Sequence, residues 1–224
     1  MVSNQQNRTW PNYRQRCLPL YKTHTTSKTI VAAITSKIRF YEVLRAFGRE
    51  INLVEFWDIL DKNGNATGRI HERGKPMRKD DYHLTVNVWI ENDNGEYLIS
   101  QRSSNKSFPN VWECTGGNAV CGDDSLTTAL KEVKEELGII LEPRNGRVIK
   151  HRLRRCDACN HCLADVWLFR QNVDLATVTL APDETSGVMW ASSNEIDRMI
   201  DEGTFRTWRA FAYMDELQEW SLGS

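Results

Sequence analysis

Three glutamates lie at the spacing of one helix face. Glu132, Glu135 and Glu136 are three and four residues apart, which places them on neighbouring turns of an α-helix. Like charges at this spacing repel, costing an isolated helix roughly a few tenths of a kcal/mol per pair. Carboxylate oxygens grouped in this way suit a hard divalent cation, Mg²⁺ or Mn²⁺. The alternative is an acidic helix face exposed to solvent, and the spacing alone does not decide between the two.

The segment around the glutamates predicts a helix from Asp124 to Leu137. Apolar residues at helical spacing form a stripe beside the glutamates, made of Leu126, Ala129, Leu130, Val133 and Leu137. Asp124 or Ser125 can cap the first turn, and Gly138 is placed to end the helix. We therefore expect the stripe to face a core while the carboxylates stay at its edge.

The elements before this helix read as strands. His83 to Glu91 alternates apolar and polar residues, and a second run, Tyr97 to Gln101, follows a turn that contains Gly95. These two runs predict a hairpin. A compact domain is expected to begin near Leu53, with a turn at Asn63–Gly64.

The elements after the helix are mixed. Strand-like runs cover 147–153, 164–169 and 188–191, and helical patterns cover 193–200 and 205–220. Hairpins and helices in this order favour an α+β sandwich over a doubly wound parallel sheet.

A motif that includes the helix resembles the Nudix box, G-x5-E-x7-R-E-U-x-E-E-x-G-U, in which U is aliphatic. Seven of its nine defined positions match: Gly117, Glu132, Val133, Glu135, Glu136, Gly138 and Ile139. At the other two, Asp123 replaces the first glutamate and Lys131 replaces the arginine. Both keep their charge, but aspartate is shorter and lysine lacks the bidentate fork of arginine.

The resemblance implies the Nudix fold, a mixed β-sheet between α-helices, and metal-dependent hydrolysis of a diphosphate linkage. The substrate would be a nucleoside diphosphate derivative or a related organic diphosphate. The family pattern assigns the Mg²⁺ or Mn²⁺ to the backbone carbonyl of Gly116 and the carboxylates of Glu132, Glu135 and Glu136. Such a cation neutralises phosphate charge, orients the substrate and acidifies a water molecule. Glu132 is the first choice of general base and Glu184 the second, with Glu135 also in the catalytic set.

Basic side chains could hold the substrate phosphates. Lys150, Arg152 and Arg154 alternate along a strand and so share one face, and Arg102 leaves the hairpin toward the motif. The alternative for the strand residues is a solvated face. Because no stacking aromatics lie near them, we expect a small-molecule diphosphate as the partner and neither nucleic acid nor a membrane.

Beyond the motif, the sequence is similar to the Nudix branch that includes isopentenyl-diphosphate isomerase. The segment Phe108–Trp112 carries this similarity, and His83 matches a metal-binding histidine of the isomerase. The isomerase has a cysteine where this chain has Gly116, and its later glutamates fall near Asn160 and Cys162 here. We therefore expect hydrolysis. Isomerisation, and a non-catalytic module that binds nucleotide or RNA, remain the alternatives.

The bulk properties divide the 224-residue chain in two. Residues 1–50 carry nine Lys/Arg against two Asp/Glu, and the rest carry 20 against 28. We expect a basic, weakly ordered extension at 1–50 and a hydrolase domain at 51–224. No apolar run is long enough to span a bilayer and no secretory pattern is evident, so a cytoplasmic location is expected. Homodimer formation is a family expectation.

A short run of thiols and one imidazole could bind zinc. Its residues are Cys156, Cys159, His161 and Cys162. Tetrahedral zinc sites usually draw on two separated pairs of ligands, so an incidental loop and a redox-sensitive loop remain open as alternatives.

Overall fold

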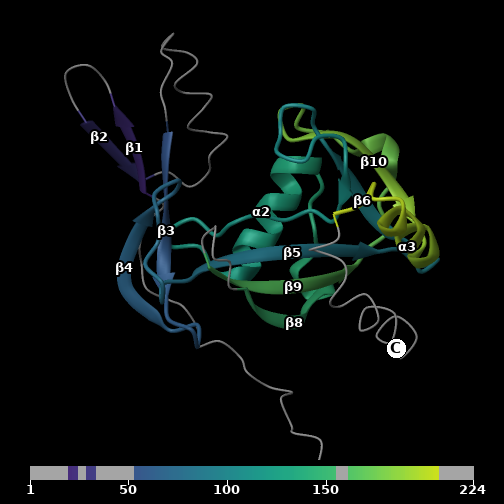
Figure 1. Cartoon of the computed structure of the whole chain (residues 1–224). Coiled ribbons are helices and arrows are strands. Elements are labelled where there is room, and N and C mark those ends of the chain that lie inside the picture. The colour runs from purple at the N-terminus through teal and green to yellow at the C-terminus, as the bar shows by residue number, and fades with distance from the viewer. Residues whose placement is uncertain (1–19, 25–28, 34–52, 155–160, 207–224) are drawn as a thin grey trace, which may run out of the picture. The chain divides into compact units, whose positions relative to one another are not determined.

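A computed structural model describes residues 20–24, 29–33, 53–154 and 161–206 (Figure 1). The described residues belong to two compact units. The first takes those of 1–84, 118–124 and 153–163, and the second those of 85–117, 125–152 and 164–224.

The first unit contains a four-stranded sheet in the order β2-β1-β3-β4. Its strands are β1 (Leu20–His24), β2 (Thr29–Ala33), β3 (Leu53–Leu60) and β4 (Ala66–Glu72). All neighbours run antiparallel, and the predicted turn at Asn63–Gly64 lies between β3 and β4. No strand was predicted at β1 or β2. Their sequences carry no clear alternation, and β1 is held by backbone pairing with β2 and β3, which a local pattern does not reveal.

A second sheet has the order β10-β6-β5-β9-β8, with β7 also paired to β6. Its strands are β5 (His83–Glu91), β6 (Tyr97–Arg102), β7 (Trp112–Glu113), β8 (Gly146–Arg154), β9 (Cys162–Arg170) and β10 (Thr185–Ala191). The predicted hairpin is confirmed, since β5 and β6 pair antiparallel. Backbone hydrogen bonds join like ends of β5 and β9, from His83 to His161 and from Gln171 to Glu91, so these two strands run parallel. The sheet is therefore mixed.

Two helices, α2 (Ser125–Leu137) and α3 (Ser193–Asp201), pack on opposite faces of this sheet. Strand β9 shows the alternation that separates the two cores. Trp167 and Phe169 pack in the cluster with α2, whereas Val166 and Leu168 pack in the cluster with α3. The predicted α+β sandwich is confirmed.

The predicted end of α2 is confirmed, because Gly138 follows the helix with φ +70°. Helix α3 begins with a capping box between Ser192 and Glu195, which the sequence analysis did not predict. Short 3₁₀ turns cover Pro143–Asn145 and Leu175–Thr177. Most of the helix predicted for 205–220 lies outside the described residues.

The end of α2 gives a stability prediction. The Gly138 N–H donates to the Lys134 carbonyl (3.0 Å), and a Cβ at Gly138 would lie 3.0–3.3 Å from Thr179 atoms. Since the left-handed conformation costs a non-glycine residue roughly 1–2 kcal/mol, Gly138→Ala should lower the free energy of unfolding by about that amount in urea titrations. Exposed Lys134→Ala is the control and should change it by less than about 0.5 kcal/mol. Wild-type stability in Gly138→Ala would contradict this account.

Candidate active site

Helix α2 holds the three predicted carboxylates at the edge of its buried face. Ala129, Val133 and Leu137 are buried in the core beneath the helix. Members of the acidic group Glu132, Glu135 and Glu136 are each half-buried, whereas neighbouring Lys134 is exposed. A purely solvated acidic face would leave all of these carboxylates exposed, so the partial burial favours a functional surface.

A glycine loop approaches one of these carboxylates closely. A Cβ built on Gly117 would overlap the carboxylate of Glu132. With glycine here, the Glu132 carboxylate can lie directly against the loop backbone, although the two residues are 15 positions apart in the sequence. Any larger residue would require the Glu132 side chain to rotate away.

The preceding glycine lies against β5. The Gly117 carbonyl accepts from Val86 N–H (2.9 Å), and the Thr115 carbonyl accepts from Val88 N–H (2.8 Å). Successive carbonyls alternate in direction along such an antiparallel pairing, so the Gly116 carbonyl is directed away from β5. A Cβ at Gly116 would overlap the Val86 carbonyl oxygen. This backbone therefore has no room for a side chain at residue 116.

The donor set suits Mg²⁺ or Mn²⁺ in chemistry, because it consists of oxygens only. Within the described ranges, however, no group of three or more His, Cys, Asp or Glu side chains is arranged to hold a metal ion. The convergence predicted for Glu132, Glu135 and Glu136 is thus not present in this conformation. Repulsion between like charges on adjacent turns favours side-chain torsions that spread the carboxylates. The side chains of Glu132, Glu135 and Glu136 would have to rotate to bring their oxygens together around a cation.

Arg102, predicted to bind substrate phosphate, instead pairs with a buried acid. Its guanidinium donates to Glu113 (2.6 Å) and to the Ser107 carbonyl (2.8 Å). Arg206 donates to the other Glu113 oxygen (2.9 Å), and the Glu113 side chain is only 6% exposed. A buried carboxylate needs such compensation, so the geometry gives Arg102 a structural role.

Glu184, the second candidate for general base, forms an ion pair with Lys106. Its backbone carbonyl accepts from Ser103 N–H (3.0 Å), which fixes the start of β10 to the loop after β6. The Glu184 side chain is 40% exposed. It is accessible to water, but its carboxylate already has a cationic neighbour.

The predicted basic strand is present as β8, and Lys131 lies on the predicted helix α2. Lys150, Arg152 and Arg154 are half-buried on β8, and Lys131 is half-buried on α2. Asp123 precedes α2 in a turn in which its N–H donates to Val120 (3.0 Å). In the proposed zinc run, Cys162 is buried, and Cys156 and Cys159 lie outside the described residues, as does Asn160.

One acid–base pair was missed by the sequence analysis. His151 Nδ1 on β8 lies 2.6 Å from Asp165 Oδ1 on β9, with side-chain exposures of 31% and 2%. The signal available was a histidine between basic residues of an alternating strand. It could not identify the pair, because the aspartate comes from the neighbouring strand.

His83, the match to the isomerase histidine, is a buried residue of the first unit. Its ring stacks on Trp57 with centroids 4.0 Å apart. Burial lowers the pKa of His83 to about 4. The ring is therefore neutral in the folded protein at physiological pH.

The arrangement of a mixed sheet between two helices is shared with a solved structure. A protein of Deinococcus radiodurans superposes with a TM-score of 0.54 at 21% sequence identity, covering 67% of this chain and 91% of that one. This likeness establishes the fold class.

Sequence comparison then gives the family. The model of the NUDIX domain matches residues 81–213. An uncharacterized Nudix hydrolase of Listeria monocytogenes is 30% identical over 68% of this chain and 88% of its own length. An isopentenyl-diphosphate isomerase of Citrobacter koseri is 22% identical over 74% of this chain and 96% of its own. The chain belongs to the NUDIX family and is a Nudix hydrolase, a class of enzymes that generally uses divalent metal ions.

No helix in the described part of the chain combines the length and apolar composition needed to cross a bilayer.

The buried histidine predicts a pH-dependent stability. The pKa of His83 is about 4 in the folded protein against an ordinary value of 6.5, so the unfolded chain binds the proton more readily as the pH falls between these values. Wild-type protein should lose on the order of 3 kcal/mol of stability from this group between pH 7 and pH 4. In urea titrations across that range, His83→Phe should show a correspondingly smaller loss. Parallel curves for the two proteins would contradict the assignment.

Proposed function

We propose that this enzyme hydrolyses the diphosphate linkage of a nucleoside diphosphate derivative or a related organic diphosphate. The observation that carries the proposal is the approach of Gly117 to the half-buried Glu132 on α2. It brings two positions of the family motif, 15 residues apart in the sequence, together within the second unit. Membership of the NUDIX family supports the reaction class, and the catalytic domain is proposed to extend over residues 51–224.

The residues proposed to hold Mg²⁺ or Mn²⁺ are the Gly116 carbonyl and the carboxylates of Glu132, Glu135 and Glu136. When bound, the cation would supply charge neutralisation for the diphosphate and acidify an attacking water. The protein contributes a fixed backbone frame, since α2 is packed on the sheet and the loop is hydrogen-bonded to β5. Lys131, which lies four residues before Glu135, is proposed to hold that carboxylate in place.

Glu132 is the proposed general base. It would accept a proton from the water whose oxygen forms the new bond to phosphorus, while the bridging P–O bond breaks. Its carboxylate lies against the glycine loop, which limits its access to bulk water. Glu184 is the second candidate, and its carboxylate already forms an ion pair with Lys106.

Phosphate contacts are proposed for Lys150, Arg152 and Arg154 of β8. Their half-buried positions leave part of each side chain accessible. Arg102 is left out of this set because Glu113 and Ser107 accept hydrogen bonds from its guanidinium.

Glu135→Gln tests the hydrolase assignment. Nucleotides, dinucleotides and prenyl diphosphates would be screened with Mg²⁺ or Mn²⁺, following phosphate-containing products by mass spectrometry. The variant should lose at least about a hundredfold in kcat/KM, the scale of a lost metal or proton-transfer contribution. Glu142→Gln, an exposed glutamate outside α2, is the matched control and should keep full activity. Equal activity in wild type and Glu135→Gln sinks the mechanism, and dimethylallyl diphosphate formed without hydrolysis would identify an isomerase.

The choice of general base is tested by pH–rate profiles. Glu132→Gln should lower kcat by about 10² to 10⁴ and remove the acidic limb of the kcat profile. Glu184→Gln should lower kcat by less than about tenfold and keep that limb, because the limb reports the ionisation of Glu132 and not of Glu184 in this assignment. Loss of the limb in Glu184→Gln alone would transfer the role to Glu184.

A further inference from the structure

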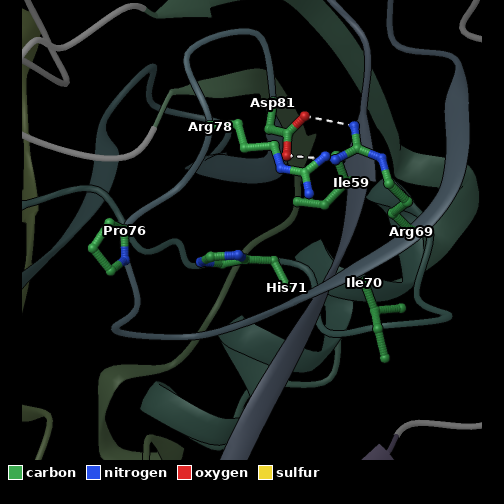
Figure 2. Close-up of a pocket in the computed structure, with 7 residues that line it drawn as sticks. All are labelled: Ile59, Arg69, Ile70, His71, Pro76, Arg78 and Asp81. Carbon is green, nitrogen blue, oxygen red and sulfur yellow. Dashed lines mark hydrogen bonds and ion pairs between the residues drawn. The ribbon is translucent and has the colours of Figure 1, made fainter.

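The first unit contains a cavity of about 340 Å³ that involves none of the motif residues. It lies where β3, β4 and the segment before β5 meet (Figure 2). Its lining is Ile59, Arg69, Ile70, His71, Pro76, Arg78 and Asp81. This volume is at the small end of the range typical of small-molecule sites.

The single acid of the cavity is already neutralised. Both oxygens of Asp81 accept from Arg69, at 2.7 and 2.5 Å, and the carboxylate is buried (Figure 2). The hydrogen bonds from Arg69 hold the pKa of Asp81 below its ordinary value. Since these contacts use two of the five guanidinium N–H groups, Arg69 keeps three donors for another acceptor.

Arg78 supplies a positive charge without a fixed acceptor. Its side chain is exposed, and its guanidinium has no hydrogen-bond or ion-pair partner among the residues that the structure describes. In Figure 2 its guanidinium lies beside the Arg69–Asp81 pair. Two arginines against one carboxylate leave the cavity with a net positive charge.

His71 adds a third polar group. Its Nε2 lies 2.9 Å from the Lys75 carbonyl oxygen, so this nitrogen donates and the ring orientation is fixed. The Trp57 ring also lies near the imidazole, and the centroids of these two rings are 6.1 Å apart. This half-buried imidazole is therefore an oriented polar group in the lining of the cavity.

The cavity also has an apolar side. Ile59 is 1% exposed and Ile70 is 46% exposed, and Pro76 also belongs to the lining. A lining with both arginines and apolar residues suits a ligand that carries an anionic and an apolar part.

We propose that this cavity binds the phosphate group of a small phosphate monoester, with Arg78 and Arg69 contacting the phosphate oxygens and Ile70 contacting the organic part. Guanidinium groups match phosphate geometry with paired N–H donors. Two guanidinium groups together supply enough N–H donors for the three terminal oxygens of one phosphate. The proposal is independent of the hydrolase assignment, because it uses neither α2 nor a metal ion.

Calorimetric titration of the full-length protein in EDTA tests this site without a contribution from divalent cations. Inorganic phosphate and phenyl phosphate should both bind, phenyl phosphate more tightly, and acetate at least about tenfold more weakly than phosphate. Arg78→Gln should weaken phosphate binding by at least about tenfold, with partial recovery in Arg78→Lys. Arg144→Gln, which removes an exposed arginine elsewhere with the same change in charge, should bind as the wild type does.

Two variants separate this site from its alternatives. Ile70→Ser should remove the preference for phenyl phosphate without changing binding of inorganic phosphate, and Glu135→Gln should bind phosphate in EDTA as tightly as the wild type. The proposal is overturned if no phosphate binds, if Arg78→Gln and Arg144→Gln bind it equally, or if acetate binds as tightly as phosphate. Because Arg78 is exposed and without a fixed partner among the described residues, its replacement should leave the thermal unfolding temperature within about 2 °C.

Discussion

The close approach between Gly117 and Glu132 is the constraint on which the proposed active site depends. A side chain at residue 117 would occupy the space of the Glu132 carboxylate, so that carboxylate would have to rotate away from the loop. The same loop is hydrogen-bonded to β5 through Gly117 and Thr115. The carboxylate therefore has a rigid backbone on one side and its own helix on the other. Its side-chain torsions are the remaining freedom through which a cation could gather the acidic group.

Contacts with the sheet also hold α2 in place. Alternate residues of β9 enter different cores, with Trp167 in the one that contains α2 and Leu168 in the one that contains α3. Trp167 also donates from its indole nitrogen to Ser125 at the first residue of α2 (2.8 Å). One side chain thus contributes to the apolar core and fixes the start of the helix. A rotation of α2 would disrupt both contacts, which is why the acidic edge keeps its orientation to the sheet.

Local sequence patterns were sufficient for most of the fold. The spacing of apolar residues predicted α2 and the β5–β6 hairpin, because each depends on near neighbours in the chain. The strands β1 and β2 were missed, since β1 is fixed by pairing with β3 some thirty residues later. Motif spacing likewise identified Gly117 and Glu132, but it could not show how the carboxylates orient. For Arg102 the sequence predicted phosphate binding and did not reveal the ion pair with Glu113. That acceptor becomes a neighbour only when β6 and β7 pair.

The buried acids that the structure describes each lie beside a basic side chain. Asp81, Glu91, Glu113 and Asp165 are all buried, and each has a basic partner: Arg69, Arg170, Arg102 with Arg206, and His151. Carboxylates removed from water need such partners. The three glutamates on neighbouring turns of α2 are half-buried, so part of each residue remains accessible to solvent. Because a divalent cation and a diphosphate must reach their ligands from solvent, an accessible group of carboxylates is the arrangement that the proposed chemistry requires.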